Sequence, residues 1–128
     1  MLTILSWFPL LLWSAFIFFL SSIPSLKVTE NWLLQIILND GGHFSFYGVL
    51  AVFAFFAFFR SHLSKPYKYS LLYAILFGIS DELHQHFVPG RTMDIRDLAL
   101  DTLGALTFLF LLKKLQSTRY SKGESRET

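Results

Sequence analysis

Acidic side chains and histidines gather in two short parts of this sequence. The stretch DELHQHFVPGRTMDIRDLALD, residues 81–101, contains five acids, two histidines and two arginines. Together with residues 40–43 it holds six of the nine acids and three of the four histidines of the chain. Carboxylates beside imidazoles can transfer protons, coordinate a cation or accept hydrogen bonds from a polar ligand. These two stretches are therefore the candidates for a functional site.

The spacing within these stretches places their polar residues on shared helix faces. Side chains three, four or seven positions apart lie on one face of an α-helix. Three sets have this spacing: Asp40, His43 and Tyr47; Asp81, His84 and Gln85; and Asp94, Asp97 and Asp101. Glu82 and His86 form a neighbouring pair four positions apart. We expect the three faces to converge on one cavity.

The rest of the composition is typical of a membrane protein. Hydrophobic residues make up 53% of the 128 residues, and charged residues only 16%. A helix of roughly 20 apolar residues crosses a bilayer core. Four segments approach that length: residues 1–25, 43–60, 69–87 and 95–112. We therefore predict an all-α membrane protein, a bundle of four transmembrane helices.

Two smaller features accompany the predicted spans. Residues 30–39, ENWLLQIILN, predict a short interfacial helix capped by Thr29, with a plain loop as the alternative. In the second span, Ala51, Ala54 and Ala57 form a small-residue stripe that allows close helix packing.

The chain ends in a polar segment. We expect residues 117–128 to form a disordered cytoplasmic tail. Residues 1–116 would then form one four-helix transmembrane domain.

Lysine and arginine are distributed unequally between the two ends of the spans. One side carries eight of them: Arg60, Lys65, Lys68, Lys113, Lys114, Arg119, Lys122 and Arg126. The other side carries three: Lys27, Arg91 and Arg96. Because basic residues favour the cytoplasmic side, we expect a multi-pass protein of the cell membrane with both termini in the cytoplasm. The acidic stretches would then face the outer leaflet.

Composition also excludes several kinds of site. The chain has no cysteine, which rules out disulfides, thiolate zinc sites and cysteine nucleophiles. Five of the eleven basic residues lie in the last sixteen positions, which indicates a solvated tail rather than a nucleic-acid-binding surface. We expect the lipid bilayer as a partner and no nucleic acid.

The motifs SDELHQHFVPGR and DLALDTLGA follow one another at the outer ends of the third and fourth predicted spans. In these motifs, and in an HF pair and a tyrosine at the start of the second span, the chain resembles the VanZ-like family. These are membrane proteins named for a component of glycopeptide resistance that lowers sensitivity to teicoplanin. The matching residues are His43, Phe44, Tyr47, Asp81, Glu82, Gln85, Pro89, Gly90, Arg91, Asp97, Asp101 and Gly104.

The resemblance covers most of the four-span region and implies a cell-envelope protein linked to antibiotic resistance. One departure concerns charge. Members of the family often carry a lysine shortly before the HF pair, where this chain has Gly41 and Gly42. A positive group beside His43 is therefore not expected.

The first functional hypothesis is binding of a polar head group presented at the outer leaflet. The ligand would be a lipid-linked cell-wall precursor, an amino-containing lipid or part of a glycopeptide. Six acids face two arginines, so a positively charged or zwitterionic ligand fits the charge balance. The expected binding residues are His43, Tyr47, Asp81, Glu82, His84, Gln85, Arg91, Asp97 and Asp101.

The second hypothesis is a membrane-embedded hydrolase or transferase acting on a lipid-linked envelope substrate. Asp81 or Glu82 would serve as general base, and His43 or His84 would carry the proton. The third hypothesis is structural: the charged residues form an ion-pair network that holds three helices together.

A divalent cation is compatible with these residues, although no cofactor is required by the pattern. His43 with Asp81 and Asp101 is the favoured ligand set. Oxygen ligands favour magnesium, calcium or manganese, and histidine adds zinc.

Overall fold

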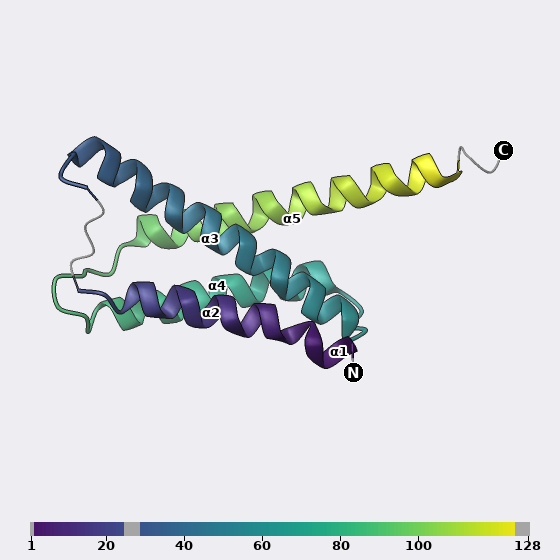
Figure 1. The fold of residues 1–128 in the computed structure, drawn as a ribbon, viewed down its shortest axis with the longest axis horizontal. Coiled ribbons are helices and arrows are strands. Elements are labelled where there is room, and N and C mark those ends of the chain that lie inside the picture. The colour runs from purple at the N-terminus through teal and green to yellow at the C-terminus, as the bar shows by residue number, and fades with distance from the viewer. Residues whose placement is uncertain (1, 25–28, 125–128) are drawn as a thin grey trace.

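The chain folds entirely into helices and short connections. The computed structural model describes residues 2–24 and 29–124, and no strand occurs among them. The helices are α1 (Leu2–Leu5), α2 (Trp7–Ser21), α3 (Trp32–Arg60), α4 (Pro66–Gln85) and α5 (Ile95–Glu124). Figure 1 shows that α2, α3, α4 and α5 run in alternating directions. The predicted all-α fold is confirmed.

The N-terminal helix pair carries apolar side chains on almost every face. Leu11, Leu12 and Phe19 are each at least 60% exposed, which is typical of a helix surrounded by lipid rather than water. Two tryptophans hold α2 against α3. Trp7 Nε1 donates to Ser61 Oγ at 3.1 Å, and Trp13 Nε1 donates to the Phe46 carbonyl at 2.9 Å.

Helix α3 is longer than the sequence predicted. It begins at Trp32 and continues without a break through Gly41 and Gly42 to Arg60. The prediction of a separate interfacial helix, or a loop, over residues 30–39 is therefore wrong. The cap is Asn31, whose Oδ1 accepts from the backbone N–H groups of residues 33 and 34 at 3.1 Å. A glycine costs only about 1 kcal/mol in a helix, too little to interrupt one that is packed along its length.

The other end of α3 is closed by a Schellman turn. His62 has φ 58°, the left-handed conformation that this turn requires. The N–H groups of His62 and Leu63 donate to the carbonyls of Phe59 and Phe58 at 3.1 and 3.2 Å. Helix α4 then begins after a short connection with Pro66 in its first turn, a position that needs no N–H donor.

Helix α5 extends past the other helices, as Figure 1 shows. It continues to Glu124, so residues 117–124 are helical where the sequence predicted a disordered tail. Extending an existing helix adds one hydrogen bond for each residue that is fixed, and this requires no new nucleus.

Two stretches in the described part of the chain are long and apolar enough to cross a membrane: Thr3–Ser21 and Trp32–Arg60. Helices α4 and α5 do not meet the same criterion, because charged residues occur near both ends of their apolar segments. Two of the four predicted spans are thus supported by length and composition.

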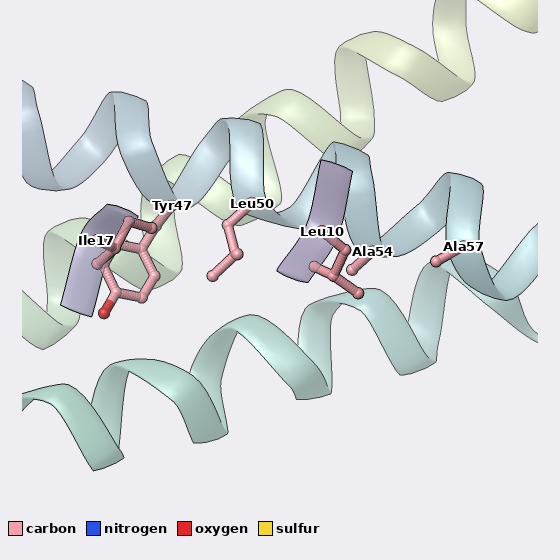
Figure 2. Packing of buried hydrophobic residues seen from close by; sticks show 6 residues of the cluster. All are labelled: Leu10, Ile17, Tyr47, Leu50, Ala54 and Ala57. Atoms are coloured by element: carbon pink, nitrogen blue, oxygen red, sulfur yellow. The ribbon is translucent and has the colours of Figure 1, made fainter. Parts of the chain in front are cut away.

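Helix α3 lies at the centre and contacts α2, α4 and α5. The predicted alanine stripe is confirmed, because Ala51, Ala54 and Ala57 are completely buried. Figure 2 shows Ala54 and Ala57 in one apolar row with Tyr47 and Leu50 of α3 and with two side chains of α2. Small side chains allow the neighbouring helices to approach closely.

The interface between α3 and α5 is the tightest in the bundle. A Cβ atom on Gly104 of α5 would collide with the backbone carbonyl of Phe44 in α3. A Cβ on Gly48 of α3 would overlap the ring of Phe108 in α5. Both positions therefore need glycine for the observed helix separation.

Candidate functional site

Polar side chains from three helices meet at the end of the bundle where α4 ends and α5 begins. His43 comes from α3, Glu82 from the last turn of α4, and Asp97 and Asp101 from the first two turns of α5. The contact of Gly104 with Phe44 lies next to them, one residue after His43 and three after Asp101. Close approach of the two backbones thus brings the imidazole to the carboxylates. We call these four residues the polar cluster.

His43 faces a carboxylate with each of its ring nitrogens. Nδ1 lies 2.9 Å from Asp101 Oδ1, which is a hydrogen bond. Nε2 lies 3.5 Å from Asp97 Oδ2. The His43 side chain is only 13% exposed, and that of Asp101 2%. Two carboxylates from one helix therefore fix the orientation of this ring.

Glu82 joins the cluster from α4. Its Oε2 accepts the backbone N–H of Asp94 at 2.7 Å, which ties α4 to the start of α5. Its Oε1 is buried and has no hydrogen-bond partner in the described part of the chain. One ligand atom from each of His43, Glu82 and Asp97 lies within 4.8 Å of the other two, a spacing that can accommodate a metal ion.

The expected ligand set of His43, Asp81 and Asp101 is not the one that the structure brings together. Successive residues of a helix point about 100° apart. Glu82 consequently faces α5, while the adjacent Asp81 faces a cavity beside α3. Asp101 contacts His43 through the other ring nitrogen.

The cavity lies between α2, α3 and α4 and has a volume of about 370 Å³. Its polar lining residues are Ser21, Gln35, Asn39, His43, Tyr47, Asp81, Gln85 and Arg91. Its apolar lining residues include Ile17, Leu20, Leu38 and Phe46. We call it the α2–α4 cavity. Only His43 belongs both to this cavity and to the polar cluster.

Several polar atoms near the α2–α4 cavity have unused hydrogen-bonding capacity. Gln85 Nε2 donates to Asp81 Oδ2 at 3.4 Å. In contrast, Tyr47 Oη, Asp81 Oδ1 and Asp101 Oδ2 are buried without a hydrogen bond of acceptable geometry to any described residue. Gly78 makes room for them, since a Cβ there would lie 3.3 Å from both Asp101 Oδ2 and the Tyr47 ring.

The structural hypothesis of an ion-pair network implied that arginines would pair with the buried acids, but neither Arg91 nor Arg96 does so. Arg91 donates from Nε and Nη2 to the carbonyls of Ile23 and Leu20, both at 3.2 Å, and so binds the C-terminal end of α2. Carbonyl oxygens at the C-terminal end of a helix carry partial negative charge, which makes a cation favourable there. Arg96 forms an exposed ion pair with Asp40 at 3.1 Å. Asp40 therefore has its ion pair outside the cluster.

His84, an expected binding residue, lies outside both the cluster and the cavity. Its Nε2 is 3.0 Å from Ser22 Oγ, and its ring stacks on Phe18 with centroids 4.3 Å apart. Although His84 is three positions from Asp81, it packs against α2 and does not line the cavity with Asp81 and Gln85. His86 is exposed and contacts the ring of Phe87.

The sequence interpretation missed part of the α2–α4 cavity. Gln35 and Asn39 line it from the first turns of α3, and Ile17, Leu20 and Ser21 line it from α2. The spacing of Gln35, Asn39 and His43 is four residues each time, which places them on one helix face. The sequence prediction missed this shared face because it assigned residues 30–39 to a helix separate from the one that contains His43.

The chain matches the family model described as VanZ/LLP1 over residues 6–116. This protein belongs to the VanZ/LLP1 family. The resemblance noted in the sequence is thereby confirmed, and the match includes every residue of the polar cluster and all lining residues named for the cavity. No curated protein and no solved structure shows significant similarity. Family membership and the two apolar helices together support a membrane protein.

Proposed function

We propose that this VanZ/LLP1 family member is a four-span membrane protein whose α2–α4 cavity binds the head group of a cell-envelope lipid. The observation that carries the proposal is the mixed lining of that cavity. Asp81 and Arg91 provide opposite charges, while Ile17, Leu20 and Phe46 provide an apolar wall. A polar head group joined to a hydrocarbon chain has the same combination of properties.

We infer that α4 and α5 span the membrane together with α2 and α3. The four helices alternate in direction, and α1 lies at the same end of the bundle as the far end of α5 in Figure 1. Most of the lysines and arginines belong to that end. The positive-inside rule then places both termini in the cytoplasm and the cavity toward the outer leaflet.

The chemistry of the lining favours a zwitterionic head group. Asp81 Oδ1 and Tyr47 Oη make no hydrogen bond of acceptable geometry in the described part of the chain, and they can receive the ammonium or hydroxyl groups of a ligand. Arg91 uses two of its five N–H donors on the carbonyls of α2, which leaves three for a phosphate or carboxylate. Asn39 and Gln85 add neutral hydrogen-bonding groups.

Lipid-linked cell-wall precursors and glycopeptides are the ligands that connect this cavity with the family name. Both present hydroxyl, amide and carboxylate groups at the outer face of the membrane. Binding of either would link the protein to teicoplanin resistance.

The proposal is tested by lipid retention in native mass spectrometry of the purified full chain. We expect phosphatidylethanolamine, whose head group carries an ammonium and a phosphate, to be retained over phosphatidylglycerol with the same acyl chains. Asp81→Asn should remove that preference, with a loss of about 10- to 100-fold in affinity for a hydrogen bond to a charged group. Asp40→Asn is the matched control, because Asp40 is an acid outside the cavity. Equal retention of the two lipids, or an equal effect of both variants, would refute the proposal.

A hydrolase or transferase acting on a lipid-linked substrate is the second candidate function. It is favoured by His43, which lines the cavity and is hydrogen-bonded at 2.9 Å to the buried Asp101. A carboxylate in this position orients an imidazole for proton transfer. Incubation of the purified protein with a lipid-linked cell-wall precursor distinguishes the two candidates, because only an enzyme releases a new product.

A further inference from the structure

We propose that His43, Glu82 and Asp97 bind one divalent transition-metal ion, Zn²⁺ in preference to Mg²⁺ or Ca²⁺, where α3, α4 and α5 meet. The three ligands are one imidazole nitrogen and one oxygen from each of two carboxylates, all within 4.8 Å of one another. An imidazole ligand selects Zn²⁺ over the hard cations, which prefer oxygen alone. Three protein ligands leave the coordination incomplete, as in catalytic zinc sites.

The distance between His43 and Asp97 agrees with two ligands of a shared ion. His43 Nε2 and Asp97 Oδ2 are 3.5 Å apart, which is longer than the usual N–H···O hydrogen bond. Two ligand atoms bound at about 2.0–2.1 Å to a tetrahedral ion lie about 3.3–3.5 Å apart. The pair is therefore already at the separation that a metal ion would impose.

The orientation of the imidazole supports the same conclusion. The hydrogen bond of Nδ1 to Asp101 Oδ1 at 2.9 Å places the ring proton on Nδ1. In a neutral ring, Nε2 then presents a lone pair toward Asp97, and the two lone pairs repel unless a proton or a metal ion lies between them. A carboxylate that fixes one imidazole nitrogen while the other binds metal is a common arrangement around zinc. Asp101 would serve as this positioning residue.

The charges around the site favour a cation. Asp81, Glu82, Asp97 and Asp101 are acids at or next to the site, and no lysine or arginine in the described ranges lies within 4.0 Å of their carboxylate oxygens. Glu82 is 1% exposed, yet its Oε1 has no partner there. Leaving a buried carboxylate oxygen unpaired is costly, and coordination to an ion removes that cost.

The site is separable from the α2–α4 cavity. Glu82 and Asp97 are not among the residues that line the cavity, whereas His43 lies at the boundary of both. The metal proposal therefore does not depend on lipid binding. Each can fail while the other holds.

The experiment is a metal titration of the purified full chain in detergent after removal of bound ions with a chelator. We expect one Zn²⁺ per chain by elemental analysis, with Mg²⁺ and Ca²⁺ unable to compete. Glu82→Gln and Asp97→Asn should each weaken binding by about 100-fold, and Asp101→Asn by about 10- to 100-fold, the range found for residues that support a metal ligand. Substituted Co²⁺ should give the absorption of a site with one nitrogen ligand, and that signal should be lost in His43→Gln.

Two control variants change the same residue types at positions outside the cluster. Asp40→Asn and His86→Gln remove an acid and a histidine outside the cluster, and both should bind as the original chain does. Circular dichroism and size-exclusion chromatography check the fold of each variant. Should Glu82→Gln fail to fold, Asp97→Asn decides the question, because Asp97 is 16% exposed near a helix start and tolerates an isosteric change. Substoichiometric Zn²⁺ in the original chain, or unchanged binding in the folded ligand variants, would overturn the proposal.

Discussion

The α2–α4 cavity and the polar cluster lie side by side, share His43, and differ in almost everything else. The cavity has an apolar wall and a volume of about 370 Å³, and its lining includes one acid, Asp81, and one arginine, Arg91. The polar cluster has ligand atoms within 4.8 Å of one another and no basic partner other than its histidine among the described residues. The cavity offers space for a molecule, whereas three ligand atoms of the cluster have the spacing of a site for a single ion.

The division between the two regions comes from one step along α4. Asp81 and Glu82 are adjacent in sequence and differ by only one methylene, but the helix turns by about 100° between them. Asp81 faces the cavity, and Glu82 faces the start of α5. Two carboxylates that look equivalent in the sequence are therefore expected to have different ligands.

The largest effect should come from filling the space between α3 and α5. Gly104→Ala places a Cβ against the backbone carbonyl of Phe44, which cannot rotate away as a side chain could. We expect a loss of about 1–3 kcal/mol or more in the free energy of unfolding. The resulting displacement of α5 should weaken metal binding more than lipid binding. Helix α5 carries Asp97 of the cluster but none of the residues that line the cavity.

Gly41→Ala is the matched control for this change. A Cβ at Gly41 would have no neighbour within 4 Å, so the substitution should stabilise α3 by up to about 1 kcal/mol through helix propensity alone. Thermal unfolding in detergent, followed by circular dichroism, compares the two variants. Equal stability would mean that α3 and α5 do not approach as closely as described.

The next largest effects should come from Asp81→Asn and Glu82→Gln, each measured for both lipid selectivity and Zn²⁺ affinity. Asp81→Asn should reduce lipid selectivity and leave Zn²⁺ binding nearly unchanged, and Glu82→Gln should do the reverse. The loss of lipid selectivity should be about 10- to 100-fold, as expected for a hydrogen bond to a charged group. The loss of Zn²⁺ affinity in Glu82→Gln should be about 100-fold, which corresponds to about 2.8 kcal/mol. Both binding measurements are made on both variants. If either substitution affected both properties equally, the two regions would have to be treated as one site.

Helical spacing allowed the sequence to predict that the faces carrying His43, Asp97 and Asp101 would meet. It assigned the third face to Asp81, His84 and Gln85, whereas Glu82 is the residue of α4 that joins the cluster. The partners of the remaining residues depended on tertiary packing. Arg91 contacts the carbonyls of Leu20 in α2 and of Ile23 just after it, 71 and 68 positions away, and only the position of this segment determines the choice.

The length of α3 illustrates a different limit of the sequence. Gly41 and Gly42 lower the local helix propensity, so the sequence favoured two separate elements. In the structure, residues 32–39 are exposed or only partly buried, and burial therefore gives them little support of their own. The continuous helix is favoured by the Asn31 cap and by burial of the following turns against three neighbours. Gln35 and Asn39 line the cavity because they belong to the same continuous helix as His43.

The smallest effect should come from Arg96, which lies next to Asp97 in sequence but belongs to neither region. Its guanidinium pairs with Asp40 at 3.1 Å, and its side chain is 69% exposed. Exposed ion pairs contribute about 0–1 kcal/mol, so Arg96→Gln should change the free energy of unfolding by less than about 0.5 kcal/mol. Zn²⁺ affinity should also stay within about twofold, because a change of this size corresponds to less than about 0.5 kcal/mol. A larger gain in Zn²⁺ affinity would show that the positive charge of Arg96 reaches the cluster, and that the cluster is less isolated from its surroundings than the burial of Glu82 and Asp101 indicates.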